Sequence, residues 1–74
     1  MEVTVKLGGQ FLLGNPKSQK LTLDPPMTAL DLALLLGLEP DEIGLIVING
    51  VQSELEDEIS ADCTISFFPY LSGG

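Results

Sequence analysis

One short helical segment, placed between strand-like segments, most constrains the fold of this chain. Residues 29–36 are nearly all apolar, follow Thr28, a good N-cap residue, and end at Gly37, a common residue after a helix C-terminus. Helical spacing puts four of them on one inward face: Ala29, Leu32, Ala33 and Leu36. Leu34 and Leu35 lie on the other side, where we expect a loop to cover them, with a partner as the alternative. A single helix of this length can cover only one face of a sheet.

The remaining segments show the patterns of β-strands. Alternating or continuous apolar residues occupy four ranges, 2–7, 20–24, 45–48 and 63–68, and a shorter strand is expected between the last two. Asn49-Gly50 is a strong hairpin signal. Because crossovers are right-handed and hairpins pair locally, the first and last strands are predicted to lie side by side in the centre of a mixed sheet. The fold class is therefore α+β, with one face of the sheet partly open.

Three apolar or acidic features lie outside this simple pattern. Phe11-Leu12-Leu13 falls in a predicted loop, where we expect it to cap the core, with a partner contact as the second interpretation. In the acidic run 54–59, Leu55 and Ile59 are predicted to reach the core while the acids face water. That run lacks the regular ligand spacing of a calcium loop. Cys63 is predicted to point inward.

Charge and composition limit the classes of partner. The 74 residues contain three lysines and eleven acids, for a net charge of −8. This balance disfavours nucleic acid and anionic membranes, and no apolar run has the roughly 18 residues of a membrane span. It favours a basic partner, although solubility alone explains it equally well. The start of the chain has no basic region typical of a signal peptide, and a single Cys63 fits a reducing compartment, so we expect a cytoplasmic protein.

The chain lacks the usual catalytic groups. It contains no histidine, arginine or tryptophan, which excludes a Ser-His-Asp or Cys-His arrangement. One cysteine without histidine does not make an ordinary zinc site, and no phosphate-binding glycine motif is present. We therefore expect no bound metal or cofactor and no active site of its own. A role as a substrate or carrier for partner enzymes remains.

The last residues of the sequence suggest how such a carrier would work. Pro69 cannot donate a strand hydrogen bond, so we expect a domain over 1–68 and an extended, flexible tail over 69–74. At roughly 3.3 Å per residue the tail would reach about 20 Å and present the carboxylate of Gly74 to another protein. Terminal glycines suit a narrow channel because they have no Cβ. Phe68, on the open face, is either a docking anchor or a half-buried rim residue.

Several of these residues together resemble a known family. The strand order, Leu36-Gly37, the Ile48-Asn49-Gly50 hairpin and the closing Phe67-Phe68-Pro69…Ser72-Gly73-Gly74 are similar to the ubiquitin-related sulfur carriers. The closing segment most resembles the small subunit of molybdopterin synthase, and the stretch from Leu36 to Gly50 resembles the thiamine-biosynthesis carrier. The resemblance implies a β-grasp fold.

The resemblance also implies partners and site residues. An E1-like enzyme would use ATP to adenylate Gly74, and a sulfur donor would convert it to a thiocarboxylate. In a molybdopterin synthase, the tail would insert into the large subunit through Pro69, Tyr70, Leu71, Ser72 and Gly73. Three alternatives stay open: a protein modifier joined through Gly74 to lysines, a carrier for thiamine synthesis or tRNA thiolation, and a plain interaction module.

Overall fold

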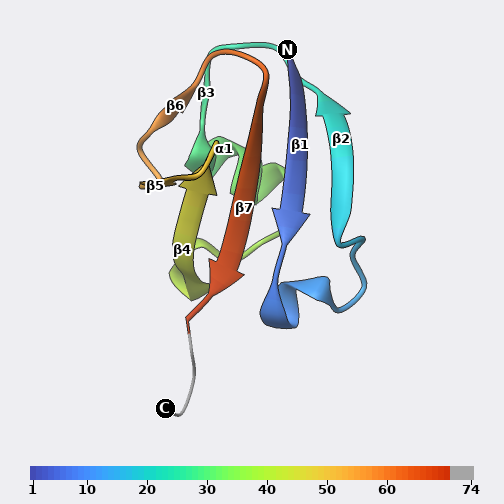
Figure 1. Ribbon diagram of the computed structural model, residues 1–74. Helices are drawn as coiled ribbons and strands as arrows, with labels where there is room; N and C mark the ends of the chain where they lie inside the picture. The colour runs from blue at the N-terminus through green and yellow to red at the C-terminus, as the bar shows by residue number, and fades with distance from the viewer. Residues whose placement is uncertain (71–74) are drawn as a thin grey trace.

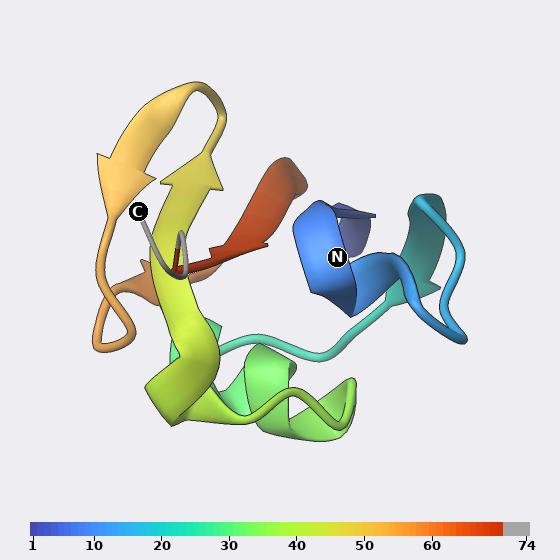
Figure 2. The same ribbon diagram turned by 90° about the horizontal axis from the view of Figure 1, so that it is seen from below.

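The computed structural model describes residues 1–70, so the predictions for Leu71, Ser72, Gly73 and Gly74 lie outside the described part of the chain. Five strands form a mixed sheet, and one helix lies against one of its faces (Figure 1 and Figure 2). The sheet strands are β1 (Glu2–Leu7), β2 (Ser18–Thr22), β4 (Ile43–Ile48), β5 (Val51–Ser53) and β7 (Cys63–Pro69). The other elements are the 3-10 helices η1 (Gly9–Leu12) and η2 (Pro40–Glu42), the helix α1 (Ala29–Leu35) and the short strands β3 (Met27–Thr28) and β6 (Glu58–Ile59).

The first and last strands are the centre of the sheet, as the sequence predicts. The strand order is β2-β1-β7-β4-β5. β1 runs parallel to β7, in a register from Val3 opposite Cys63 to Leu7 opposite Phe67, and the other neighbours are antiparallel. The Asn49-Gly50 turn joins β4 to β5 as predicted, with Ile48 opposite Val51.

The helix begins where the sequence indicates, and its first turn is tied to a distant loop. Thr28 and Asp31 form a reciprocal capping box, with N···O distances of 3.1 and 3.0 Å. The backbone N–H groups of Ala29 and Leu30 donate to carbonyls in the acidic loop, at residues 57 and 55. The loop therefore satisfies donors that a helix N-terminus leaves free. It also keeps a seven-residue helix, too short to be stable alone, in place on the sheet.

A second, two-stranded sheet was not predicted. β3 pairs antiparallel with β6, with Met27 opposite Ile59. Each strand has two residues, too few to show a period in the sequence. The pairing brings Ile59 into the core, where it is 2% exposed, and Leu55 packs against the same core. Both inward predictions for the acidic run are confirmed.

The core lies between α1 and the covered face of the sheet. Its fully buried members come from both central strands and the helix: Val3, Val5, Ala29, Leu32, Ala33, Ile65 and Phe67. Leu36 and Cys63 are partly buried and pack against them, in agreement with the predicted inward faces. Within residues 1–70, no helix has the length and apolar character that crossing a bilayer requires.

The prediction that a loop covers Leu34 and Leu35 is wrong, and the prediction that Phe11-Leu12-Leu13 caps the core holds for Phe11 but not for Leu13. Leu34 and Leu35 are 56% and 61% exposed, so no loop within residues 1–70 covers them. The reason is that α1 packs on the sheet through one narrow face and has only solvent on its outer side. Phe11 is buried and caps the core as expected, but Leu13 points away and is exposed, because η1 turns the chain at Leu12.

Replacing Phe67 should test the core assignment. Phe67 is fully buried on the central strand, so Phe67→Ala should lower the free energy of unfolding by about 3–5 kcal/mol, a large share of the usual 5–15 kcal/mol. Denaturant unfolding followed by circular dichroism measures it. Phe68→Ala, one residue along the strand on the open face, is the matched control and should cost clearly less. Equal losses for the two variants would contradict the assigned faces.

Candidate functional site

The candidate site is the place where the chain leaves the sheet after β7. Pro69 lies opposite Ile43 of β4, and the N–H of Tyr70 donates to the carbonyl of Glu42 at 3.2 Å. The last strand therefore includes Pro69, so the predicted strand over 63–68 ends one residue too early. Pro69 and the backbone of Tyr70 both lie against the β4 side, and the division into a domain and a tail stays a prediction.

Alternation along the strand explains why proline does not end the pairing. The carbonyl of Phe67 accepts a hydrogen bond from the N–H of Gly8, on the β1 side, whereas Tyr70 bonds on the β4 side. Successive residues of a strand point their backbone groups to opposite neighbours, so residue 69 faces the β1 side. β1 has already ended at Leu7, and no strand partner there needs the missing N–H.

Gly44 allows β4 to approach the departing chain closely. The register between β4 and β7 shifts between Ile43 and Leu45, and Gly44 is the extra residue at this irregularity. A Cβ at Gly44 would lie 2.8 Å from Tyr70 Cα and 2.9 Å from its backbone nitrogen, closer than such atoms come in proteins. Only a residue without a side chain fits beside Tyr70 in this arrangement.

The glycine pair after β1 makes a similar approach from the other side. A Cβ at Gly8 would lie 2.5 Å from Cδ1 of the Phe68 ring, and one at Gly9 would lie 2.8 Å from Cγ of Pro69. Neither this glycine pair nor Gly44 is predicted from the sequence to contribute to the site. A lone glycine inside an apolar strand is a known sign of a bulge or a close backbone contact, and that signal was available.

Exposed apolar side chains surround the exit. The group that we call the exit patch consists of Gly44, Leu45, Phe68, Pro69 and Tyr70, which line a surface hollow of about 450 Å³. Within it Leu45, Phe68 and Tyr70 are 37%, 38% and 66% exposed. Leu45 and Phe68 alternate with the buried Ile46 and Phe67, so they lie on the face of the sheet opposite α1. Phe68 thus has the exposure that a docking residue requires, and its partner-binding role stays a prediction.

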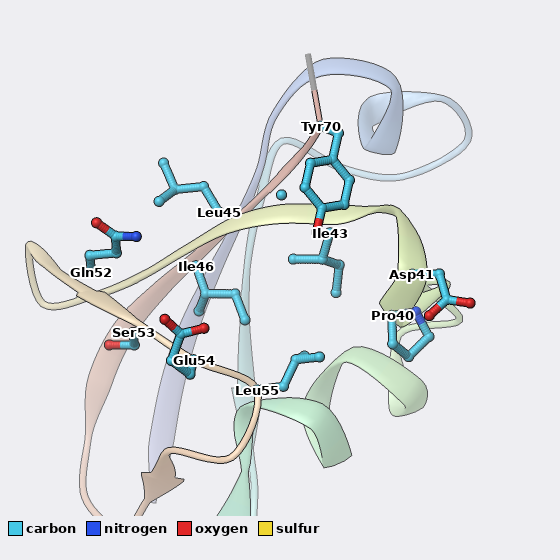
Figure 3. Close-up of a pocket in the computed structure, with 11 residues that line it drawn as sticks. Pro40, Asp41, Ile43, Leu45, Ile46, Gln52, Ser53, Glu54, Leu55 and Tyr70 are labelled. Carbon is cyan, nitrogen blue, oxygen red and sulfur yellow. The ribbon is translucent and has the colours of Figure 1, made fainter. Parts of the chain in front are cut away.

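A second pocket with acidic side chains adjoins the exit patch. It has a volume of about 300 Å³ and shares Gly44, Leu45 and Tyr70 with the patch. Figure 3 shows the Tyr70 ring at one end of this pocket and Leu55 at the other, with Asp41 and Glu54 along its sides. The site therefore combines apolar surface with carboxylates.

The positive charges lie on the β1 and β2 side of the sheet. Lys6 is on β1, Lys20 is on β2, and Lys17 is in the connection between these strands. β2 and β4 are separated by the two central strands. The three lysines thus lie toward one edge of the sheet, and the acidic pocket lies toward the other.

Cys63 is not arranged as a reactive group. It begins β7, at the opposite end of that strand from the exit. Partial burial, and to a smaller extent the carboxylate of Asp62, raise the pKa of its thiol from the ordinary value of 9.0. A raised pKa keeps the thiol protonated and a weak nucleophile at neutral pH. Within residues 1–70, no cluster of three or more His, Cys, Asp or Glu side chains could hold a metal ion.

The Cys63 environment predicts a pH dependence of stability. The thiol ionises less readily in the folded protein, so its stabilising contribution is complete below pH 9.0 and is lost as pH rises through the raised pKa. Denaturation midpoints of the wild type should fall relative to those of Cys63→Ala as pH rises above 9.0. Parallel midpoints for the two proteins over the whole range would contradict this environment.

Comparisons with known proteins identify the fold. The structure is similar to SAMP1 from Haloferax volcanii, with a TM-score of 0.74 and 23% sequence identity over 100% of both chains. It is also similar to a Pyrococcus furiosus protein assigned as molybdopterin converting factor, subunit 1, with a TM-score of 0.72 and 18% identity over 95% of this chain and 98% of that one. No protein-family model matches the chain, and the search of curated proteins gave no match. At these identities the likeness establishes the β-grasp fold, which confirms the fold that the sequence resemblance implies.

Proposed function

We propose that this protein is a sulfur carrier whose C-terminal Gly74 is adenylated by an E1-like enzyme and converted to a thiocarboxylate. The observation that supports this most is the position of the exit. The central strand of a β-grasp sheet leads the chain out beside an exposed apolar patch, on the face that the helix leaves free. Four residues, Leu71 to Gly74, then follow Tyr70 in the sequence. A partner that docks on the patch would therefore have the terminal carboxylate within reach.

The chemistry needs two steps, both carried out by partner enzymes. A carboxylate oxygen of Gly74 attacks the α-phosphorus of ATP, which forms an acyl adenylate and releases pyrophosphate. Sulfide from a sulfur donor then attacks the carbonyl carbon, and the carbon–oxygen bond to AMP breaks. The products are AMP and a thiocarboxylate in which sulfur has replaced one oxygen. This chain contributes only the carboxyl group and the surface that presents it.

The surface around the exit supports a protein partner with both apolar and basic groups. Leu45, Phe68 and Tyr70 offer apolar and aromatic area, the type of surface that dominates binding energy in interfaces. Asp41 and Glu54 lie next to it and would attract lysine or arginine side chains. We assign this surface to the E1-like enzyme and, in turn, to the large subunit of a molybdopterin synthase.

The choice of molybdopterin synthesis as the receiving pathway has two supports. One is the resemblance of the segment from Phe67 to Gly74 to the small subunit of molybdopterin synthase. The other is the similarity in fold to a protein whose name refers to molybdopterin. Thiamine synthesis and tRNA thiolation use the same carrier chemistry and are the alternatives that a test must separate.

Intact-mass measurement tests the carrier function directly. Incubation with ATP, an E1-like enzyme and sulfide should increase the mass by the difference between sulfur and oxygen, with the change confined to Gly74. A variant that carries one additional residue after Gly74 should not be converted, because its carboxyl group is displaced from the reacting position. As a control, the same enzyme preparation should activate another carrier protein in the same conditions. If that control works and the wild type keeps its unmodified mass, the proposal is refuted.

The same mixture distinguishes the carrier from a protein modifier. Amines attack the acyl adenylate as sulfide does, so a modifier would form isopeptide bonds to lysines of other proteins. Conjugates of higher mass that disappear on deletion of Gly74 would favour the modifier. Supplying the thiocarboxylate form to a candidate large subunit with the pterin precursor then decides whether molybdopterin synthesis is the pathway.

Substitution of Phe68 tests the docking surface. Phe68→Ala removes a partly exposed ring from the exit patch, so the Kd for the E1-like enzyme should rise about tenfold or more while the fold is retained. Surface plasmon resonance gives both rate constants. Leu34→Ala, which removes an exposed side chain from α1 on the other face, is the control and should leave binding unchanged.

The association rate should fall as salt increases if the acidic side chains attract the partner.

A further inference from the structure

We propose that Gly44 is a positioning residue that sets the direction in which the chain leaves the sheet. Its missing side chain lets the backbone of Tyr70 lie against β4, and this placement sets the point from which a docked partner receives the end of the chain. The inference rests on the proposed function and adds to it the residue on which presentation of Gly74 depends.

The contact at Gly44 is with backbone atoms, which makes it restrictive. The two atoms nearest to an added Cβ are Tyr70 Cα and N, at 2.8 and 2.9 Å. A clash with a flexible side chain could be relieved by rotation, but a clash with Cα and N moves the chain itself. Gly44 does not have a positive φ, so alanine is compatible with its own backbone conformation. The three atoms nearest to the added Cβ all belong to Tyr70, so an alanine at this position acts first on that residue.

Other contacts hold the exit from both sides. On the β4 side, Tyr70 is held by its hydrogen bond to the carbonyl of Glu42. On the β1 side, Pro69 has no N–H to donate, and its ring instead lies against Gly9. Gly8 lies against the ring of Phe68, which is part of the exit patch. Gly44 and Gly8 thus act on different parts of the site, the first on the backbone path and the second on a docking side chain.

This division predicts different kinetic effects for the two glycines. The reacting carboxylate is four residues beyond Tyr70 in the sequence, so a partner docked on the exit patch receives the chain from the position of Tyr70. A displacement of about 1 Å at a reacting group can reduce a rate about a hundredfold. Loss of the backbone placement should therefore lower kcat, whereas displacement of the Phe68 ring should raise KM.

The test compares three alanine variants in the full chain. Gly44→Ala should lower kcat for pyrophosphate release by an E1-like enzyme about ten- to hundredfold and should change KM by a clearly smaller factor. Gly8→Ala should instead raise KM several-fold at similar kcat. Gly37→Ala is the control for lost stability, because its φ of +79° strains alanine and no atom lies within 4 Å of the added Cβ. Its kcat and KM should match the wild type.

A structural readout separates positioning from general destabilisation. Hydrogen exchange of the Tyr70 amide should speed up at least tenfold in Gly44→Ala and stay near the wild-type rate in Gly37→Ala. Tyr70 is also the single tyrosine in a chain without tryptophan, so its fluorescence anisotropy reports on the exit. We expect lower anisotropy in Gly44→Ala.

Two results would overturn the inference while the proposed function stands. One is a wild-type kcat for Gly44→Ala despite faster exchange at Tyr70. The other is unchanged exchange and anisotropy at Tyr70, which would show that the backbone does not depend on Gly44. A wild type that no E1-like enzyme adenylates is a different result, because it refutes the proposed function itself.

Discussion

The parallel pairing of β1 with β7 is the constraint on which the rest of the structure depends. Two parallel neighbours cannot be joined by a tight turn, so the intervening chain must cross over and return. In a protein of 74 residues this crossover holds the only α-helix within residues 1–70 and the outer strands of the sheet. Because the two strands run in the same direction, both of them end at the same end of the sheet. For this reason Gly8 and Gly9, which follow β1, lie beside Phe68 and Pro69 near the end of β7.

The single helix gives the sheet two unequal faces. α1 and the side chains beneath it form the core, and the opposite face keeps apolar residues that nothing in residues 1–70 covers. The 70 described residues form no second layer on this face, so an apolar residue there either stays exposed to water or contacts another molecule. Leu45, Phe68 and Tyr70 gather where the chain leaves the sheet rather than being scattered over it. This concentration favours use as a contact surface over chance exposure.

The sequence is most informative where structure is set by local chemistry. Alternation predicts the strands, the capping residues predict the helix to within one residue, and Asn49-Gly50 predicts the hairpin. The two-residue strands β3 and β6 escape prediction because their pairing is decided by the loop at residues 55–57 bonding to the helix N-terminus. The exposure of Leu34 and Leu35 depends on how α1 sits on the sheet, which periodicity does not give.

The candidate site is predicted only in part, for a similar reason. The sequence indicates an exit near Pro69 and a docking role for Phe68, but it places the end of the strand too early. Whether proline ends a strand depends on which neighbour its missing N–H would face, and here β1 has already ended. The role of Gly44 depends on the distance between two strands at a register shift. Both are properties of the assembled sheet.

The distribution of charge suggests how a partner is oriented as well as attracted. A net charge of −8 acts in all directions, but the acids next to the exit patch and the lysines near β2 act locally. Adjacent strands are about 4.8 Å apart, so β2 lies roughly 14 Å from β4, beyond the screening length of about 8 Å at physiological salt. A basic partner at the β4 side of the exit therefore lies nearer to the carboxylates of Asp41 and Glu54 than to Lys20 on β2. Near the β2 edge, the same partner meets lysines that oppose its approach. This asymmetry favours approach from the β4 edge of the sheet over approach from the β2 edge.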